Sequence, residues 1–388
     1  MESAFIFDIP TKLHFGSGTL NRLHRLGLPG KKALIVISGG RSMKTYGYLE
    51  RVQEQLTLGG AAYAIYDKVK PNPTLENVMQ GAALAREEDC DFVVGLGGGS
   101  SIDCAKAIAI AAVHEGDFWN YQRGKTGKGK QFSNPPLPVV AITTTAGTGS
   151  EIDPWFVITK TETNEKSGSG WVPYSYPVLA IVDPDLMMTV PSKMTAYQGF
   201  DALFHATESV INRFENSFAE MFALRAVEYV GQYLPRAVSD GGDKEARTYM
   251  AMANTLAGFY MNCTSEHSLE HELSAFHPEL PHGAGLIMIA RAYYQTMADG
   301  HACDEQMIKL AIALGRKDAS SAQDFVDALD ELMRACGVDA LKMSDYGIRQ
   351  EEFPEMVASA RAMGGLFEAD PLTLSDEQLL NIYRDSFR

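Results

Sequence analysis

The chain has 388 residues, a formal net charge of −15 at pH 7, 45% hydrophobic residues and 21% charged residues. This length exceeds what one hydrophobic core usually supports, so we expect two domains. The excess of acidic residues argues against nucleic acid and anionic membrane surfaces as partners, because both attract basic proteins. No apolar run reaches the roughly 18 residues that a membrane-spanning helix needs.

The N-terminus and the cysteines indicate a cytoplasmic protein. The first residues, "MESAFIFDIPTKLHFGSG", lack the basic stretch and following apolar stretch of a secretory signal peptide. The five cysteines are widely spaced and form no CxxC pair, so they predict no disulfide framework. Free thiols are typical of the reducing cytosol.

The first half of the chain alternates short β-branched runs with amphipathic helical segments. Strands that alternate with helices predict a Rossmann-like parallel sheet with helices on both of its faces. The predicted strands are 31–38, 61–69, 91–99, 137–145 and one within 176–187, and the predicted helices are 46–59, 74–90 and 100–113.

The second half of the chain has a different residue pattern. After Pro184 and Pro191, nearly all of the sequence has helical periodicity and few β-branched runs. We therefore predict an α/β dinucleotide-binding domain over residues 1–187 and an all-α domain over residues 188–388.

Two glycine-containing turns in the first half are candidates for binding a dinucleotide. In "VVGLGGGSSIDCAKA" (93–107), three glycines join a strand to a helix, so the backbone can approach a phosphate and the helix offers unpaired N–H groups. "TTTAGTGSE" (143–151) adds hydroxyls and backbone amides at the end of a neighbouring strand, where parallel sheets bind ligands. A plain tight turn is the alternative interpretation of the glycines. The candidate cofactor residues are Gly98, Gly99, Ser100, Asp103, Thr144, Thr145 and Thr148.

The strand predicted at 31–38 ends in "ISGGRSMK", where an NAD-preferring site commonly has an acidic residue that binds the ribose hydroxyls. No acidic residue is present in this stretch. Ser38, Gly39 and Gly40 leave room and free amides, and Arg41 is suited to pair with a 2′-phosphate. We therefore expect NADP(H) in preference to NAD(H), with a glycine-tolerant surface turn as the alternative.

Histidines gather in the second half. "GFDALFHATES" (199–209) places Asp201 and His205 four residues apart in a predicted helix, so both side chains lie on one face. "HSLEHELSAFHPELPHG" (267–283) repeats that spacing and adds a histidine at a helix start. Carboxylate and imidazole donors suit Fe²⁺ or Zn²⁺ and can leave one coordination position open. Each histidine alone could be a hydrogen-bonded core residue, but two such pairs favour a metal site. The candidate donors are Asp201, His205, His267, His271 and His282.

The order of these motifs resembles that of the iron-containing (group III) alcohol dehydrogenases, and the likeness covers essentially the whole chain. It rests on "GGGSSIDCAKA", "TTTAGTGSE", "GFDALFHATES" and "HSLEHELSAFHPELPHG". "EHELSAF" and the glycine turn after the strand at 31–38 are most similar to the NADP-dependent butanol dehydrogenase and aldehyde reductase branch. The resemblance implies the dehydroquinate synthase-like architecture, with an α/β N-terminal domain and an all-α C-terminal domain.

The resemblance also implies roles for individual residues. Lys166 and Asn72 match residues that contact the cofactor, His271 lies near the substrate as the catalytic residue, and His277 stays outside the ligand set. The implied reaction is a metal-dependent, reversible hydride transfer between NAD(P)(H) and a primary alcohol or aldehyde, in a homodimer or larger homo-oligomer. The implied ligands of Fe²⁺, or of Zn²⁺ as the alternative ion, are Asp201, His205, His267 and His282.

Two other functions compete with this one. A dehydroquinate synthase-like or glycerol dehydrogenase-like enzyme would act on a polyol or a sugar phosphate, and a sugar phosphate needs a basic pocket. Few lysines or arginines surround the histidines at 265–283. A non-catalytic metal-binding or nucleotide-binding protein would not need an open coordination position together with a nicotinamide site.

Overall fold

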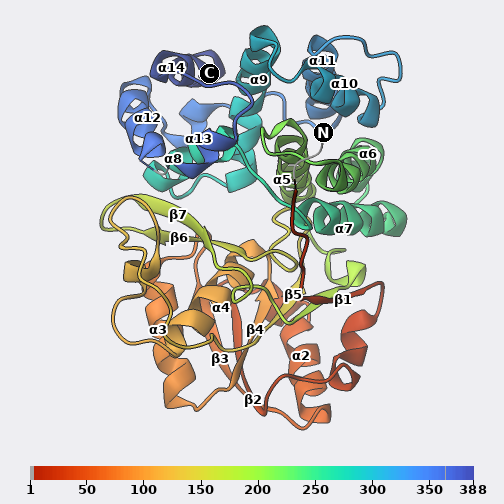
Figure 1. Ribbon diagram of the computed structural model, residues 1–388. Helices are drawn as coiled ribbons and strands as arrows, with labels where there is room; N and C mark the ends of the chain where they lie inside the picture. Colours follow the sequence, from red (N-terminus) through yellow and green to blue (C-terminus); the bar gives the residue numbers. More distant parts are fainter. Residues whose placement is uncertain (1–3, 363) are drawn as a thin grey trace. The chain divides into compact units, whose positions relative to one another are not determined.

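The computed structural model describes residues 4–362 and 364–388, which form two compact units (Figure 1). The α/β unit comprises Asp8–Thr145 and Gly149–Thr189. The helical unit comprises residues 4–7, Ala146–Thr148 and Val190–Arg388. The sequence predicted one change of architecture after residue 187, whereas the structure also assigns two short earlier segments to the helical unit.

A six-stranded sheet forms the centre of the α/β unit. All of its pairings are parallel, in the order β1-β8-β5-β4-β2-β3, which confirms the predicted parallel sheet. The edge strand β1, which pairs with β8, was not predicted, because its four residues, KLHF, are too few to show a clear period. The strands are β1 (Lys12–Phe15), β2 (Lys32–Ser38), β3 (Ala62–Val69), β4 (Phe92–Gly97), β5 (Val139–Thr143) and β8 (Leu179–Val182).

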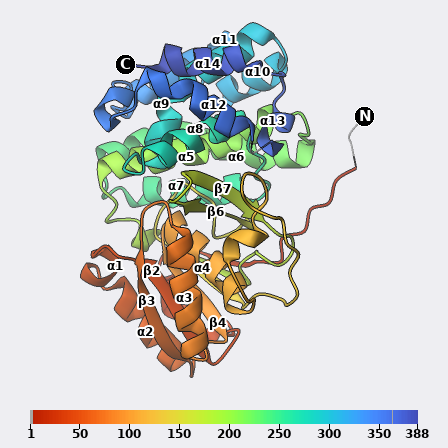
Figure 2. The ribbon, with the colours of Figure 1, turned by 90° about the vertical axis from the view of Figure 1, so that its left-hand side faces the viewer.

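Alternating side chains of the strands fill a separate core on each face of the sheet. Leu34 and Val36 of β2 pack in one cluster with residues of α3 (Leu75–Glu87) and α4 (Gly99–Ala112). Ile35 packs in the other cluster, with residues of α2 (Tyr48–Leu58) and the 3-10 helix η1 (Thr19–Arg25). Figure 2 shows α3 and α4 in front of the strands and α2 behind them. Both faces are therefore buried, which explains the nearly continuous apolar strands.

The strand order reverses direction between β2 and β4. The chain leaves β2 for β3 on one side and leaves β4 for β5 on the other, while β2 and β4 pair directly, with Val36 opposite Gly95. Open parallel sheets bind ligands at the carboxyl ends of the strands at such a switch point. The turns that follow β2 and β4 are two of the three turns for which the sequence predicted cofactor contacts, and the third follows the neighbouring strand β5.

An antiparallel hairpin, β6 (Trp155–Lys160) and β7 (Glu165–Gly170), completes the α/β unit and was not predicted. Its turn includes Asn164 at φ 50°, a left-handed conformation that asparagine tolerates. The strand β7 has the sequence EKSGSG, which lacks the β-branched residues that mark a strand in sequence.

The helical unit is built around α5 and α8, whose residues are buried over most of their lengths. A helix that is buried on nearly every side belongs at the centre of a helical assembly, and the surrounding helices cover it. The described helices are α5 (Ser192–Ile211), α6 (Ser217–Ser239), α7 (Lys244–Gly258), α8 (Ser265–Phe276), α9 (His282–Gly300), α10 (Asp304–Ala313), α11 (Gln323–Ala335), α12 (Phe353–Arg361), α13 (Gly365–Ala369) and α14 (Asp376–Ser386). Among these described residues, no helix combines the length and the apolar character needed to cross a bilayer.

Candidate metal centre and cofactor turns

The central helix α5 brings Asp201 and His205 to one face. The two side chains are four residues apart and are 4% and 6% exposed, respectively. Their atoms Asp201 Oδ1 and His205 Nε2 lie 3.7 Å apart. The helical spacing therefore places both donors at one point, as the sequence predicted.

Two further helices supply the other imidazoles. His267 lies in the first turn of α8, and His282 is the first residue of α9, directly after the N-cap Pro281. The start of α9 passes close to α5. A Cβ at Gly283 would lie only 2.8 Å from the carbonyl carbon of Tyr197. Glycine is required at this approach, which carries the ring of His282 toward Asp201.

Three of the four predicted donors, the imidazoles, surround the fourth, which is the carboxylate oxygen of Asp201. Asp201 Oδ1 lies 3.7 Å from His205 Nε2, 3.8 Å from His267 Nε2 and 3.5 Å from His282 Nε2. Four ligands about 2.1 Å from a common ion in tetrahedral geometry lie roughly 3.4 Å from one another. The observed separations are close to that value, so the cluster has the size of a metal site.

Two buried atoms of this cluster have no hydrogen-bond partner among the described residues. They are Asp201 Oδ1 and His267 Nε2. A buried polar atom without a partner costs on the order of 1–3 kcal/mol, and more when the group is charged. Both atoms point into the same cluster, so one divalent cation would satisfy them together. The residues present therefore fit a bound metal.

At two of the four donors, Asp201 and His205, electrostatics favour the protonation state that a metal needs. At His267, by contrast, the opposing effect of burial is outweighed by Cys263 and Glu208, which raise the pKa of its ring. Burial by itself raises the pKa of Asp201, but the imidazoles of His205, His267 and His282 oppose it and hold that pKa at about 2. Burial lowers the pKa of His205, which keeps its ring neutral. An ionised carboxylate and a neutral imidazole are the forms that bind metal.

The carboxylate of Glu208 connects two elements of the site. Its Oε1 accepts a hydrogen bond from His267 Nδ1, and its Oε2 accepts one from the backbone N of Thr264 at 2.6 Å and one from the Thr264 hydroxyl at 2.8 Å. Glu208 is fully buried. It therefore fixes both the start of α8 and the orientation of the His267 ring, with Nε2 directed at the cluster.

His282 and His205 are oriented in the same way. His282 Nδ1 donates to Glu270 Oε2, and His205 Nδ1 donates to the carbonyl oxygen of Gly147 at 3.1 Å. In each case the second ring nitrogen, Nε2, faces Asp201 Oδ1. Glu208 and Glu270 were not predicted from the sequence; the available signal was a carboxylate on the apolar side of a helix that also carries a histidine donor.

His271, the predicted catalytic residue, lies beside the four donors. Its ring centroid is 5.5 Å from that of His282 and 6.3 Å from that of His267. Atoms of Glu270, His271 and His282 form a second group within 4.8 Å of one another. His277 lies elsewhere, because its Nε2 pairs with Glu352 at 3.0 Å.

The α/β unit brings together most residues of the two glycine-containing turns. The backbone N of Thr144 donates to the carbonyl of Gly97 at 2.9 Å. A Cβ at Gly98 would lie 2.9 Å from Cγ2 of Thr145, so these turns are in direct contact. Gly99 begins α4 and Ser100 follows it, which leaves backbone amides of the first helical turn facing this edge.

The other predicted cofactor residues differ in their surroundings. The turn Ser38–Arg41 follows β2, with Gly39, Gly40 and Arg41 exposed. Asn72 lies between β3 and α3 with φ 53°, and Lys166 is buried in β7. Thr148 belongs to the helical unit, unlike the remaining members of the set.

Asp103 is engaged within the chain. Its Oδ1 accepts from the Ser150 hydroxyl at 2.6 Å, and its Oδ2 accepts from the backbone N of Val157 at 2.9 Å. Burial raises the pKa of this carboxyl, while Lys106 opposes the increase. Asp103 thus ties α4 to the segment that leads into the β6–β7 hairpin.

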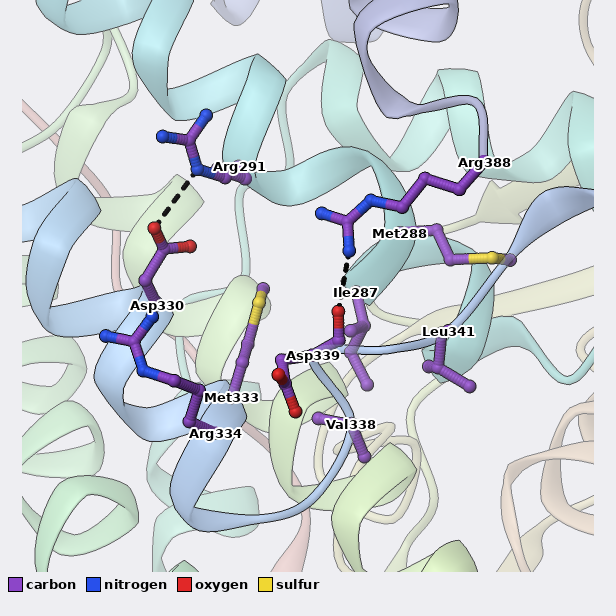
Figure 3. Close-up of a pocket in the computed structure, with 10 residues that line it drawn as sticks. All are labelled: Ile287, Met288, Arg291, Asp330, Met333, Arg334, Val338, Asp339, Leu341 and Arg388. Atoms are coloured by element: carbon purple, nitrogen blue, oxygen red, sulfur yellow. Dashed lines mark hydrogen bonds and ion pairs between the residues drawn. The ribbon is translucent and has the colours of Figure 1, made fainter.

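A separate pocket of about 180 Å³ lies in the helical unit (Figure 3). In it, Arg291 pairs with Asp330 at 3.1 Å, and Arg388 donates to the carbonyl oxygen of Asp339 at 2.8 Å. None of the predicted metal donors lines this pocket, so it is distinct from the histidine cluster. The lining residues are Ile287, Met288, Arg291, Asp330, Met333, Arg334, Val338, Asp339, Leu341 and Arg388.

Comparison with known proteins agrees with this arrangement. Residues 10–184 match the family model of the iron-containing alcohol dehydrogenases, and residues 195–387 match the model of the C-terminal part of that family. The chain is 33% identical over 400 residues to a 1,3-propanediol dehydrogenase of Klebsiella pneumoniae, with 99% of each chain covered. It is 31% identical to a long-chain primary alcohol dehydrogenase of Thermoanaerobacter ethanolicus, with 98% of each chain covered.

Among solved structures, an archaeal halo-thermophilic alcohol dehydrogenase from a Red Sea brine pool superimposes with a TM-score of 0.93 at 36% identity, covering all of both chains. These similarities support an alcohol dehydrogenase and not the dehydroquinate synthase-like or glycerol dehydrogenase-like alternative. The chain belongs to the iron-containing alcohol dehydrogenase family, and it is an alcohol dehydrogenase that binds iron and uses a nicotinamide cofactor.

Proposed function

We propose that Asp201, His205, His267 and His282 hold the iron of this alcohol dehydrogenase. The observation that carries the proposal is the position of Asp201 Oδ1, which lies 3.5–3.8 Å from Nε2 of all three imidazoles. The buried, unpartnered atoms of Asp201 and His267 support it. Fe²⁺ is the ion implied by the family, and the same donors are also suited to Zn²⁺.

We propose that the nicotinamide cofactor binds at the turns after β2, β4 and β5, with contacts from Asn72 and Lys166. NADP(H) is preferred over NAD(H) in this proposal, because the turn after β2 has no carboxylate that would bind ribose hydroxyls and repel a 2′-phosphate. Arg41 is exposed at that turn and supplies a matching positive charge.

The proposed reaction is reversible hydride transfer between the nicotinamide and a primary alcohol or aldehyde. When bound, iron supplies a Lewis acid for the substrate oxygen, and the nicotinamide gives or takes the hydride. Glu208 and Glu270 hold the rings of His267 and His282 in the orientation that directs Nε2 toward Asp201. His271, next to His282, exchanges the alcohol proton with solvent at a ring nitrogen.

We further propose a cytoplasmic homodimer or larger homo-oligomer. The five cysteines are all free, which suits a reducing compartment. Large apolar side chains of the helical unit are exposed, including Ile6, Phe214 and Met221, and such side chains are typical of subunit contacts. Light scattering of the purified protein tests the oligomeric state.

The proposed function is tested by loading metal-free protein with Fe²⁺ and following NADPH absorbance with butanal. We expect oxidation of NADPH by the wild type, whereas His267→Ala should lose both metal and turnover while it still binds NADPH. Sustained turnover in metal-depleted His267→Ala would contradict the ligand assignment. Retained nucleotide binding serves as the control for folding of the α/β unit.

A further inference from the structure

One cysteine of the five lies beside the histidine cluster. The sulfur of Cys263 and one ring nitrogen from each of His205 and His267 all lie within 4.8 Å of one another. The rings of these two histidines stack with centroids 4.6 Å apart and an interplanar angle of 18°. The sulfur therefore shares both imidazoles with the carboxylate of Asp201.

The backbone around Cys263 is fixed on both sides. The residue before it, Asn262, donates from its N to the Ser209 hydroxyl at 3.1 Å, and its carbonyl accepts from Asn212 Nδ2 at 3.2 Å. The residue after it, Thr264, donates to Glu208 from both its backbone N and its hydroxyl. Glu208 and Ser209 belong to α5, the helix that carries Asp201 and His205, and Asn212 is the C-cap residue of that helix. The position of the thiol is therefore tied to the metal-binding helix.

A second observation points to a ligand at this place. His267 is 3% exposed, and its Nε2 has no hydrogen-bond partner among the described residues. The other four cysteines lie in different surroundings. Cys90 and Cys104, for example, pack in the apolar core of the α/β unit. Cys263 is thus the cysteine that forms a donor group with imidazoles.

We propose that Cys263 is a thiolate ligand for thiophilic divalent cations at this centre. His205, His267 and Cys263 would bind Zn²⁺, Co²⁺ or Cd²⁺. A thiolate is a soft ligand, so it binds these ions more strongly than it binds the harder ions that favour carboxylate oxygen. Binding breaks the S–H bond, forms a sulfur–metal bond and releases one proton to solvent, with no change of oxidation state. This inference rests on the proposed iron centre, since both donor sets use His205 and His267.

Sharing of the two imidazoles has a consequence for metal selection. One chain can fill only one of the two donor sets at a time, so a thiophilic cation competes directly with iron. Iron remains with Asp201, His205, His267 and His282, whereas zinc is drawn toward the sulfur. The centre therefore selects between metal ions by their softness, because softer ions bind the thiolate set and iron binds the carboxylate set.

The experiment is a Co²⁺ titration of the metal-free full-length chain, followed by calorimetry and by near-ultraviolet absorbance. We expect one equivalent to bind to the wild type with a sulfur-to-cobalt charge-transfer band. Cys263→Ser should bind Co²⁺ and lose that band. Cys303→Ser, which changes a buried cysteine outside the histidine group, is the matched control and should keep it.

The outcomes separate this inference from the proposed function. Co²⁺ bound by the wild type without the band would overturn the thiolate ligand and leave the iron centre intact. A band that persists in Cys263→Ser would overturn it as well. Failure of the wild type to bind any Co²⁺ would overturn the metal centre itself and the inference with it. If Cys263→Ser does not fold, Cys263→Ala takes its place, and the charge-transfer band must be present in the wild type and absent from Cys263→Ala.

Discussion

The carboxylate of Glu208 accepts a hydrogen bond from Nδ1 of His267, although the two residues are 59 positions apart in the sequence. The bond joins α5 to α8 and leaves Nε2 of the imidazole directed at Asp201. A carboxylate in this position fixes the tautomer of a ligating histidine and makes its other nitrogen a better donor. Glu270 does the same for His282.

This relationship predicts the effect of removing each carboxylate charge. Glu208→Gln and Glu270→Gln should each lower the affinity for Fe²⁺ by about 10–100-fold, because the ligating ring of His267 or of His282 is oriented less firmly. Competition with a chromophoric chelator measures the change. Glu228→Gln is the control, since Glu228 pairs with Arg225 on the surface. An affinity unchanged in both variants would show that these carboxylates do not support the centre.

The approach of α9 to α5 predicts the effect of one methyl group. A Cβ at Gly283 would lie 2.8 Å from the carbonyl carbon of Tyr197, so Gly283→Ala must displace the backbone beside His282. We expect a loss of about 1–3 kcal/mol in the free energy of unfolding, together with weaker metal binding. Gly365→Ala meets nothing within 4 Å and should cause neither change. Equal stability of the two variants, measured in urea, would contradict the close approach.

A buried carboxyl away from the donors predicts a dependence of stability on pH. Asp370 is fully buried, accepts hydrogen bonds from Ser265 N and the Tyr293 hydroxyl, and has its pKa raised by burial to about 6. An unfolded aspartate titrates near pH 3.9, so the folded chain binds more protons between about pH 4 and pH 6. Stability contributed by this group is therefore lost as pH rises through that window.

Asp370→Asn removes this titration. From about pH 5 to about pH 7.5, the stability of the Asn variant relative to wild type should rise by on the order of 1 kcal/mol. Urea unfolding of the metal-free proteins at the two pH values measures the difference. Asp385→Asn, at an exposed position of α14, should show no such change. A constant difference between Asp370→Asn and wild type would mean that the carboxyl titrates alike in both states.

The cofactor proposal predicts the effect of adding a carboxylate after β2. Ser38→Asp should shift the ratio of rates with NADPH and NADH toward NADH, because the new charge repels a 2′-phosphate and can accept from ribose hydroxyls. Arg41→Ala should weaken NADPH binding more than NADH binding. Fluorescence titration with both nucleotides measures these changes. The cofactor assignment at this turn fails if neither variant alters the ratio.

Much of the site follows from local sequence rules. Asp201 and His205 share a helical face because of their spacing, and Pro281 marks the helix start at which His282 lies. Glu208 and Glu270 are harder to identify, since acidic residues in helices are mostly solvated. Their roles depend on partners 59 and 12 positions away, respectively, and those contacts exist only after the helices have packed.

The fold shows the same division between local and long-range information. Strands such as β2 and β4 are apolar and buried on both faces, so their sequences identify them. The edge strand β1 and the polar strand β7 are stabilised by pairing with β8 and β6, and their own residues give little signal. The position of Cys263 likewise depends on contacts of its neighbours with α5, which no short motif encodes.

The most direct test of the metal assignment is anomalous diffraction at the iron absorption edge from crystals of the Fe²⁺-loaded protein. The donor geometry predicts one strong peak per chain, about 2.0–2.2 Å from Asp201 Oδ1 and from Nε2 of His205, His267 and His282. A peak bound by other residues, or no peak at these donors in a protein that retains stoichiometric iron and activity, would contradict the assignment.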